Sequence, residues 1–385
     1  MTKRIIIISP LGYTGLAYYD YSLAESLQVS GNDVVLVTSK GWKVQDRPRT
    51  FQVLPLYFNP STSSCGLVKG LLYLAATFNV ILYLAKTTSI NSVIQFEMSE
   101  LPCVDWLVFL FCHLRKLKVV YTPHEIVHNK NYPGNTFFMK TMYQLANKVV
   151  VLNAKNIKEC VANYDIPKSK IAVIPHGNYS YFTNSISKKN ARSKLGFHDD
   201  DELLLFFGTL RPDKGLDIVL DALQLLSSSS PKLKLLIAGK PFGDMSEAFI
   251  NSMILSRDLK DRVIFHGKFI PDNDVDYYFC ASDILLLTYR RVFESGVLNL
   301  AQTYGRAVIC SDLPEFRESV QHLVNGMLFP ANNSKALALT ISESLANREY
   351  DELGKRAQRI SQEKGDWHMI ANSYANEYKD VGCKS

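Results

Sequence analysis

Short β-branched, apolar runs alternate with longer helical patterns along the whole chain. The runs at 4–8, 33–37, 92–95, 118–122, 148–152, 171–174, 203–207, 233–238, 263–266, 284–287, 307–309 and 327–329 are predicted strands. Most are continuously apolar, which is typical of parallel strands covered on both faces. Segments between them, such as 17–30, 215–228 and 297–304, have apolar residues at helical spacing. Alternation of this kind predicts a doubly wound α/β architecture.

The rhythm of strands and helices restarts once. After Pro175-His176-Gly177-Asn178, the segment 179–187 is rich in Ser, Asn and Tyr, and a new strand begins at Leu203. This break predicts two similar Rossmann-like domains, at 1–180 and 181–365. An amphipathic segment over 366–385 ends the chain as a further helix.

Composition narrows the class of protein. A chain of 385 residues with 47% hydrophobic residues has enough apolar side chains for a core in each domain, which excludes intrinsic disorder. The seven cysteines are scattered, without a C-x-x-C pair, so they indicate reduced thiols rather than zinc ligands or disulfides. The first apolar run is too short for a signal peptide. The run 71–85, interrupted by Thr77 and Asn79, is too short to span a bilayer.

Charge is unevenly distributed. The net charge is +6, and residues 1–180 carry 18 Lys and Arg against 10 Asp and Glu. A basic first half favours an anionic partner such as a membrane surface. Nucleic acid is disfavoured, because no recognised binding motif accompanies the charge. The apolar stretch 106–111, followed by Arg115, Lys116 and Lys118, is consistent with shallow membrane contact, and a core helix is the alternative interpretation.

Three loops follow predicted strands and carry candidate chemistry. The first contains Gly12 and Gly15, whose backbone N–H groups can approach a ligand, although it lacks the G-x-G-x-x-G spacing of dinucleotide sites. The second, after a strand that ends before Gly208, places Arg211 and Lys214 three residues apart. Both cations suit phosphate oxygens. The alternative is a turn and a solvated basic loop.

The third loop contains Glu294 and leads through Ser295 and Gly296 into a helix, whose free N–H groups can hold an anion. Glu294 is the only carboxylate in this loop and could accept hydrogen bonds from sugar hydroxyls. An ordinary capped helix is the alternative.

Together these motifs resemble GT-B glycosyltransferases, particularly glycosyltransferase family 4. The resemblance lies in the loop from Gly208 to Asp217, in Ile237-Ala238-Gly239-Lys240, in Gly267-Lys268-Phe269-Ile270, and in Ser295-Gly296 with Gly305-Arg306-Ala307-Val308. Pro175-His176-Gly177-Asn178 is similar to the family's interdomain crossing, and Asp366-Trp367 to its last helix. The match is dense over 170–380 and loose before it.

The resemblance implies two Rossmann-like domains facing a cleft, an acceptor-binding domain at 1–180 and a donor-binding domain at 181–365, with the helix of 366–385 crossing back onto the first. It implies that Arg211 and Lys214 neutralise a departing diphosphate. The phosphates would also be held by the donor-binding residues Gly208, Ser295, Gly296, Val297 and Leu298. Phe269 and Ile270 would flank the base, with Gly239 and Lys240 nearby.

From the first domain, the resemblance implies that Gly12 and Gly15 face the cleft and that His124 reaches the sugar. It implies no bound metal and no cofactor. Asp199-Asp200-Asp201 contains a D-x-D pair, but it precedes its strand and is interpreted as a solvated acidic turn.

One departure from the family concerns its Glu-x7-Glu pair. Alignment on Gly305-Arg306-Ala307-Val308 puts Val292 and Leu300 at those positions. Glu294 and Gln302 lie two residues further on and are the expected substitutes.

The leading hypothesis is a retaining, metal-independent glycosyltransferase of polysaccharide biosynthesis, cytoplasmic or peripheral at the inner face of the cell membrane. It would use a UDP- or GDP-sugar donor and a surface-polysaccharide or polyprenyl-linked glycan acceptor. The alternative is a catalytically silent GT-B subunit that activates a partner. A sugar-nucleotide epimerase and a nicotinamide dehydrogenase fit the loops less well.

Overall fold

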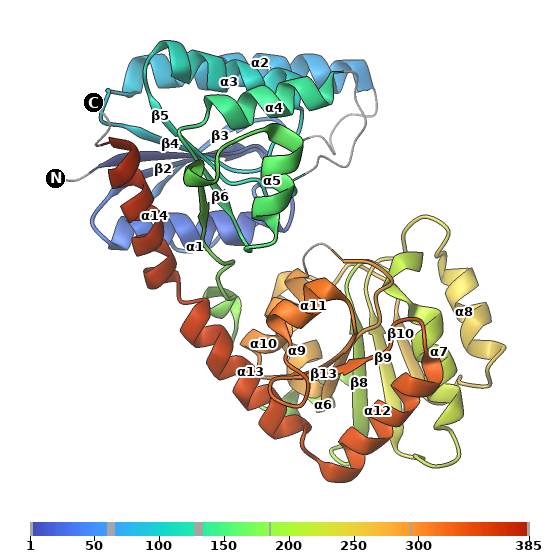
Figure 1. The fold of residues 1–385 in the computed structure, drawn as a ribbon. Helices are drawn as coiled ribbons and strands as arrows, with labels where there is room; N and C mark the ends of the chain where they lie inside the picture. The colour runs from blue at the N-terminus through green and yellow to red at the C-terminus, as the bar shows by residue number, and fades with distance from the viewer. Residues whose placement is uncertain (1–2, 60–65, 127–133, 185, 293–294, 383–385) are drawn as a thin grey trace. The chain divides into compact units, whose positions relative to one another are not determined.

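The computed structural model describes residues 3–59, 66–126, 134–184, 186–292 and 295–382. The chain forms two compact units, one made of Met1–Gly177 with Gly365–Ser385 and the other of Asn178–Lys364. The C-terminal segment therefore folds with the first domain. Figure 1 traces both units along the chain.

The first domain is a seven-stranded parallel sheet in the order β3-β2-β1-β4-β5-β6-β7. Its elements are β1 (Arg4–Ser9), α1 (Leu16–Val29), β2 (Asp33–Ser39), β3 (Gln52–Tyr57), α2 (Gly66–Thr87), β4 (Val93–Phe96), α3 (Pro102–Leu114), β5 (Lys118–Tyr121), α4 (Asn135–Leu145), β6 (Lys148–Val151), α5 (Asn156–Tyr164), β7 (Ile171–Val173) and α14 (Trp367–Gly382). Helices α2, α3 and α4 cover one face of the sheet, and α1 and α14 cover the other (Figure 1).

The second domain is a six-stranded parallel sheet in the order β10-β9-β8-β11-β12-β13. Its elements are α6 (Lys188–Leu195), β8 (Glu202–Phe207), α7 (Leu216–Leu225), β9 (Leu233–Ala238), α8 (Glu247–Leu255), β10 (Val263–His266), α9 (Asp272–Ala281), β11 (Ile284–Leu287), α10 (Gly296–Thr303), β12 (Ala307–Ser311), α11 (Pro314–Ser319), β13 (Met327–Phe329), α12 (Ser334–Asn347) and α13 (Tyr350–Lys364). Helices α7, α8 and α12 pack on one face, and α6, α9, α10 and α11 on the other.

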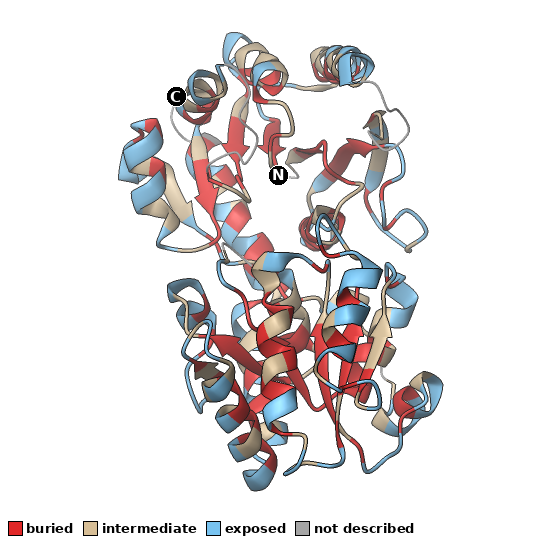
Figure 2. Cartoon of the chain, turned by 90° about the vertical axis from the view of Figure 1, so that its right-hand side faces the viewer, coloured by how far each residue is buried: buried red, intermediate tan, exposed pale blue. Residues whose placement is uncertain are grey.

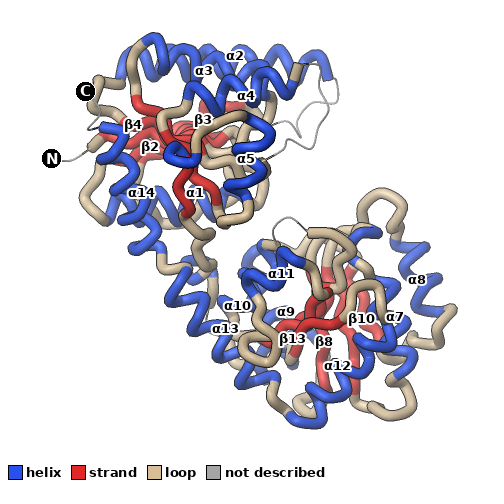
Figure 3. The backbone as a smooth tube through the Cα atoms, in the orientation of Figure 1, coloured by secondary structure: helices blue, strands red, loops and turns tan. Residues whose placement is uncertain are grey.

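Burial explains why these runs became central strands. Figure 2 colours the strands of both sheets largely buried, and Figure 3 shows them inside a shell of helices. Strand β1 is buried from Ile5 to Ser9, since helices cover both faces. This is the continuous apolar pattern that the sequence displayed. The predicted α/β class, with two doubly wound sheets and a C-terminal helix, is confirmed.

The sequence prediction missed β3, which adds a seventh strand to the first sheet. This strand lies at the edge and contains Pro55, and only Tyr57 of its six residues is buried. Proline is tolerated there because an edge strand leaves part of its hydrogen-bonding capacity unused.

In each sheet the strand order reverses between two neighbouring strands, β1 and β4 in the first and β8 and β11 in the second. Loops leave such a pair in opposite directions, and ligands of open α/β sheets bind at the carboxyl ends there. The loops after these four strands are therefore where a site is expected in each domain.

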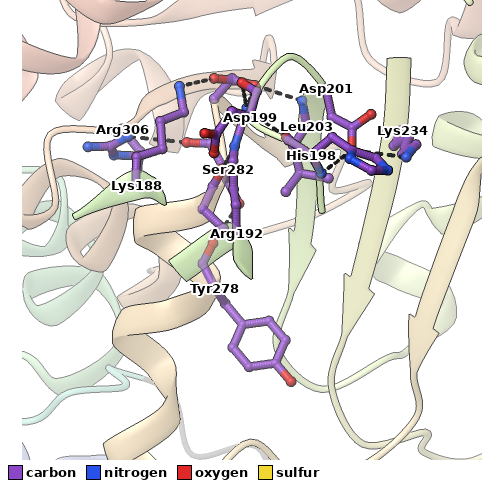
Figure 4. A network of polar contacts seen from close by, with 12 residues as sticks. Lys188, Arg192, His198, Asp199, Asp201, Leu203, Lys234, Tyr278, Ser282 and Arg306 are labelled. Carbon is purple, nitrogen blue, oxygen red and sulfur yellow. Dashed lines mark hydrogen bonds and ion pairs between the residues drawn. The ribbon is translucent and has the colours of Figure 1, made fainter. Parts of the chain in front are cut away.

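A buried polar network braces the second domain at the opposite, amino ends of β8 and β11 (Figure 4). Asp283 accepts hydrogen bonds from Arg192 NH2 (2.9 Å) and from Leu203 N (2.7 Å), and it is also paired with Lys188. Arg192 donates further to the carbonyls of His198 and Ala281. Because these residues come from α6, α9 and the turn before β8, the network ties three segments together.

Candidate active site

The loop after β8 has a fixed backbone shape. Gly208 has φ +108° and Gly215 has φ +70°, both in the region that favours glycine. A Cβ on Gly215 would lie 2.1 Å from the carbonyl oxygen of Thr288. Between the two glycines, Pro212–Lys214 forms a short 3-10 turn. Any side chain at Gly215 would therefore push this loop away from its neighbour.

The loop after β11 clamps the loop after β8 in place. Thr288 Oγ1 donates to the carbonyls of Lys214 and Gly215, each at 2.9 Å. Arg290 donates from its guanidinium to the Pro212 carbonyl (2.7 Å) and to Asp217 (2.6 Å). The sequence analysis missed Thr288 and Arg290, although both follow a predicted buried strand. They unite the two loops at the reversal point of the second sheet.

The two cations of this loop are held in different ways. Arg211 is exposed, and its guanidinium forms a fork with Asp213 at 3.1 and 2.9 Å. Lys214 Nζ lies 3.5 Å from the ring centroid of buried Tyr289, a cation–π contact. Burial, with repulsion from Arg211, lowers the pKa of Lys214 to about 8. A nearby anion would favour the charged form of this amine and raise its pKa again, so the loop suits phosphate.

The loop after β9 approaches that same loop very closely. A Cβ on Gly239 would lie 1.7 Å from the carbonyl oxygen of Gly208, so only glycine fits there. Leu210 N donates to the Lys240 carbonyl at 2.9 Å, and the Lys240 side chain is exposed. The predicted donor residues Gly208, Gly239 and Lys240 are thus brought together.

After β10, the two residues expected to flank a base differ in exposure. Phe269 is 58% exposed, whereas Ile270 is 5% exposed and packs in the hydrophobic core. Only Phe269 offers its side chain to a ligand; Ile270 supports the loop from beneath.

Helix α10 begins as the sequence predicted, with Ser295 as its N-cap. Ser295 Oγ accepts a hydrogen bond from Leu298 N at 3.3 Å. A Cβ on Gly208 would lie 3.4 Å from Val297, so the start of α10 adjoins the loop after β8. Gly296 opens the helix, and Leu298 is buried in the core.

The expected substitutes for the family's glutamate pair remain predictions. Glu294 lies outside the described residues. Gln302 is buried, and its Nε2 donates to the carbonyl of Ser319 at 3.2 Å. The Gln302 amide is therefore engaged within the second domain.

In the first domain, Gly12 and Gly15 follow β1 but differ in their surroundings. A Cβ on Gly12 would lie 2.0 Å from Thr38 Oγ1 and 2.8 Å from Trp42 Cδ1. Around Gly15, at the start of α1, a Cβ would meet no atom within 4 Å. Gly12 is thus required by packing, whereas none of the residues that the structure describes would be met by a side chain at Gly15.

His124 pairs with a buried carboxylate that the sequence analysis missed. His124 Nε2 lies 3.0 Å from Glu97 Oε2, and Glu97 has no exposed surface. Glu97 follows β4 and His124 follows β5, so neighbouring parallel strands bring them together. Burial raises the pKa of Glu97 to about 8. A carboxylate directly after a predicted buried strand was the signal that could have identified it.

The C-terminal helix supports this pair through a chain of hydrogen bonds. Gln95 Nε2 donates to Glu97 Oε1 (3.1 Å), and Gln95 Oε1 accepts from the Tyr378 hydroxyl of α14 (3.0 Å). Tyr19 packs edge-on against His124, with ring centroids 4.7 Å apart, and its hydroxyl lies 2.7 Å from that of Tyr374. Helix α14 therefore helps to position His124.

The start of the C-terminal helix packs closely against Gly177 through Trp367. A Cβ on Gly177 would lie 2.2 Å from the buried Trp367 ring. Asp366 caps α14 by accepting from Met369 N at 2.9 Å.

The residues that the structure describes contain no cluster of three His, Cys, Asp or Glu side chains suited to a metal ion. In the acidic turn before β8, Asp200 pairs with Lys232 and Asp201 with Lys234. This turn lies at the amino end of the sheet, opposite the glycine loops.

Comparison with known proteins places this geometry in a family. Residues 187–363 match the family model of glycosyl transferases group 1, and residues 13–177 match that of glycosyltransferase family 4. The chain belongs to the group 1 glycosyltransferases of the family 4 type. The resemblance inferred from its motifs is confirmed.

Curated relatives of this glycosyltransferase are distant. An uncharacterised glycosyltransferase of Methanocaldococcus jannaschii is 28% identical over 60% of this chain and 59% of its own length. The lipopolysaccharide 1,2-N-acetylglucosaminetransferase of Salmonella typhimurium is 22% identical over 56% of this chain and 58% of its own. The chain thus spans less than two thirds of the length of these two relatives. An uncharacterised protein of the Klebsiella pneumoniae cps region is 22% identical over 78% of this chain and 83% of its own.

Solved structures share the fold over the whole chain. Sucrose-phosphate synthase from Thermosynechococcus elongatus matches with a TM-score of 0.78, 20% identity and complete coverage of both chains. Anabaena HepE in complex with UDP matches with a TM-score of 0.76 and 18% identity, covering 98% of this chain and 100% of its own. These likenesses confirm the GT-B fold class.

The two glycines after β1 allow a matched test. Gly12→Ala should destabilise the glycosyltransferase by about 1–3 kcal/mol, because the new methyl overlaps Thr38 and Trp42. Gly15→Ala should leave the free energy of unfolding unchanged or slightly higher. Urea unfolding of both variants measures the difference. If Gly15→Ala keeps its stability but loses activity, a ligand approaches that backbone; equal destabilisation by both changes would contradict the packing argument.

The buried Glu97 predicts a pH dependence of stability. Its pKa is raised from 4.5 to about 8, so the folded protein binds a proton that the unfolded chain releases between these values. The contribution of Glu97 to stability should therefore fall as pH rises from about 4.5 to about 8. Glu97→Gln, which mimics the neutral acid, should reduce this decline in thermal unfolding measured at pH 5.5 and 8. Exposed Glu343→Gln is the control; equal declines in all three proteins would refute the assignment.

Proposed function

We propose that this chain is a retaining, metal-independent glycosyltransferase that takes a sugar from a UDP- or GDP-sugar. Its acceptor would be a surface-polysaccharide or lipid-linked glycan. The observation that carries the proposal is the pair Arg211 and Lys214 on a loop clamped at the reversal point of the second sheet. Two cations on a rigid glycine-bounded loop suit the diphosphate of such a donor.

The proposed chemistry separates charge between sugar and diphosphate. The bond between the anomeric carbon and the β-phosphate oxygen breaks, and the anomeric carbon bonds to an acceptor hydroxyl oxygen. The hydroxyl proton leaves with the diphosphate. Lys214 and Arg211 stabilise the negative charge that develops on the departing oxygen, which lowers the barrier directly. On donor binding, the Arg211 guanidinium would exchange its hydrogen bonds to Asp213 for hydrogen bonds to the phosphates. The exposed ring of Phe269 would contact the base.

The proposed acceptor class is supported by the name of one relative. One relative is a lipopolysaccharide transferase, and another is encoded in a cps region. The name of the first relative supports a surface-glycan acceptor. We further propose that this acceptor is built on a lipid carrier at the cytoplasmic face of the membrane. His124, oriented by Glu97, would contact the sugar from the first domain.

Thermal unfolding with UDP, GDP, ADP, CMP and NAD tests the donor site. A ligand at about 100 times its dissociation constant should add about 2.7 kcal/mol to the stability. We expect stabilisation by one of UDP or GDP and its loss in the Arg211→Ala/Lys214→Ala variant. No stabilisation by any nucleoside diphosphate would overturn the proposal.

The alternative of a silent subunit predicts binding without turnover. The retained Arg211 and Lys214 argue against it, because a silent subunit does not need to stabilise a leaving group. Purified chain incubated with the matching nucleotide-sugar should release free nucleoside diphosphate slowly, and much faster with acceptor extract. Binding without any release, in either condition, would favour the silent subunit.

A further inference from the structure

Helix α2 presents apolar side chains to the outside of the first domain. It is 22 residues long and strongly apolar, yet its buried residues are only Tyr73, Ala76, Thr77, Val80 and Leu84. The apolar side chains that are 43–76% exposed are Leu67, Val68, Leu71, Leu72, Phe78 and Leu82. Their spacing of three and four residues places most of them along one stripe of the helix. We call these six residues the α2 apolar face.

The opposite side of α2 is fixed to the domain. Tyr73, Val80 and Leu84 are buried in the core, and the Tyr73 hydroxyl donates to buried Asp105 of α3 at 2.7 Å. By length and apolarity alone α2 could cross a membrane. Because one side is packed against the sheet and α3, the helix is placed to lie along a surface with its other side outward.

The charges around the α2 apolar face are basic. From Gly66 to Thr87 the helix has no carboxylate, and its charged residues are Lys69 and Lys86. Helices α2 and α3 both end where the chain returns to the amino ends of β4 and β5, so their last residues share one edge of the domain. At that edge the 71%-exposed Leu114 precedes exposed Arg115 and Lys116.

We propose that the α2 apolar face docks the first domain on an anionic lipid bilayer, with Lys86, Arg115 and Lys116 meeting the headgroups. Leucine and phenylalanine side chains would enter the boundary between headgroups and acyl chains, and the basic residues would stay at the anionic surface. A second copy of this chain fits less well, since a two-fold contact brings like-charged edges together or buries them. The inference goes beyond the proposed function, because it requires no particular donor or acceptor.

This surface differs from the one that the sequence suggested. In the stretch 106–111, Val108 and Phe109 are 1% exposed and the other four residues are partly buried, so the stretch is part of the core, as its alternative interpretation held. Arg115 and Lys116 after it are exposed and supply the charge, whereas Lys118 is half-buried in β5. The apolar part of the surface comes instead from α2.

Vesicle co-sedimentation of the full chain tests the proposal. Wild type should sediment with vesicles containing about 30% phosphatidylglycerol, and at least tenfold less with pure phosphatidylcholine. Leu71→Glu/Phe78→Glu should reduce the partition coefficient at least tenfold. The matched control is Leu339→Glu/Leu255→Glu, at equally exposed positions on α12 and α8 of the second domain. The control should sediment like wild type.

Charge is tested separately. Lys86→Glu/Arg115→Glu should weaken sedimentation with phosphatidylglycerol vesicles, whereas Lys335→Glu/Lys189→Glu, two exposed lysines of the second domain, should not. Nucleotide stabilisation should be unchanged in every variant, so that failure here is distinct from failure of the donor-site proposal. Equal sedimentation by the wild type and the α2 variant would overturn the inference. The inference would also be overturned if the wild type binds no vesicles but forms a dimer that Leu71→Glu/Phe78→Glu dissociates.

Discussion

Lys214→Ala should lower the rate of sugar transfer about 10²–10³-fold and leave the fold intact. Adding Arg211→Ala, to give the double variant, should lower this rate further. Lys214 is held over Tyr289 by a loop that Thr288 and Arg290 fix, so its amine is positioned before any ligand arrives. A charge that is already in position needs no rearrangement during the reaction, so removing it lowers the rate of transfer. Steady-state release of nucleoside diphosphate measures the effect.

The control for this prediction is Lys232→Ala. Lys232 is an exposed cation of the same domain that pairs with Asp200 at the amino ends of the strands. Transfer by this variant should match that of the wild type. A Lys214→Ala enzyme as fast as Lys232→Ala would mean that this loop does not meet the leaving group.

The lowered pKa of Lys214 adds a pH test. Burial lowers the pKa of Lys214 to about 8, so without a ligand Lys214 loses its positive charge as pH rises through that value, whereas Arg211 stays charged. Affinity for a nucleoside diphosphate should therefore fall between pH 7.5 and 9, where the ligand's own phosphates are already ionised. In Lys214→Arg the cation persists across this range. If Lys214→Arg binds the nucleoside diphosphate, its affinity should not fall over this pH range. An identical fall in affinity would mean that a group other than Lys214 is titrating.

Asp283→Ala should destabilise the second domain by about 3–5 kcal/mol, because it leaves a buried guanidinium without its counter-charge. Arg192 is 3% exposed, and Asp283 is its only carboxylate partner among the ion pairs of the described residues. Asp283 also accepts from Leu203 N, at the start of the central strand of that sheet. Urea unfolding followed by far-ultraviolet circular dichroism measures the loss.

Asp200→Ala is the matched control, since it removes an ion pair whose two side chains are 63% and 68% exposed. Exposed pairs contribute little, because water and salt screen them. The urea midpoint of this variant should stay at the wild-type value. If both substitutions shift the midpoint equally, the network of Figure 4 is not the brace described above.

Much of the fold followed from local pattern. Among the described residues, twelve of the thirteen strands lie within or overlap the predicted apolar runs, since strands covered on both faces are mostly apolar. The exception, β3, is an edge strand that contains Pro55 and has only one buried residue, so it lacks the continuous apolar pattern. The loops at the carboxyl ends of the strands could be recognised in the sequence by their glycines, Gly208, Gly215 and Gly239. Other residues do not fit the backbone conformation or the close contacts at these positions.

Only part of the candidate site could be predicted from the sequence. Arg211 and Lys214 lie three residues apart, so the sequence displayed them as a pair. Their clamp comes from Thr288 and Arg290, more than 70 residues later, and no local pattern links the two loops. Likewise the hydrogen bond from Gln302 Nε2 to the Ser319 carbonyl could not be predicted from the sequence, and a role of Gln302 near a ligand stays a prediction. Such partnerships depend on which strands become neighbours.

The sequence by itself determined the two parallel sheets, the glycine-bounded loops and the cations they carry, because strand burial and glycine geometry are local requirements. Only the tertiary structure decided that Glu97 pairs with His124, and that Tyr378 supports this pair through Gln95, which lies 283 residues before Tyr378. It also decided which side of α2 faces outward. An apolar helix has no preferred rotation until its neighbours are known, and here the Tyr73–Asp105 hydrogen bond helps to set it.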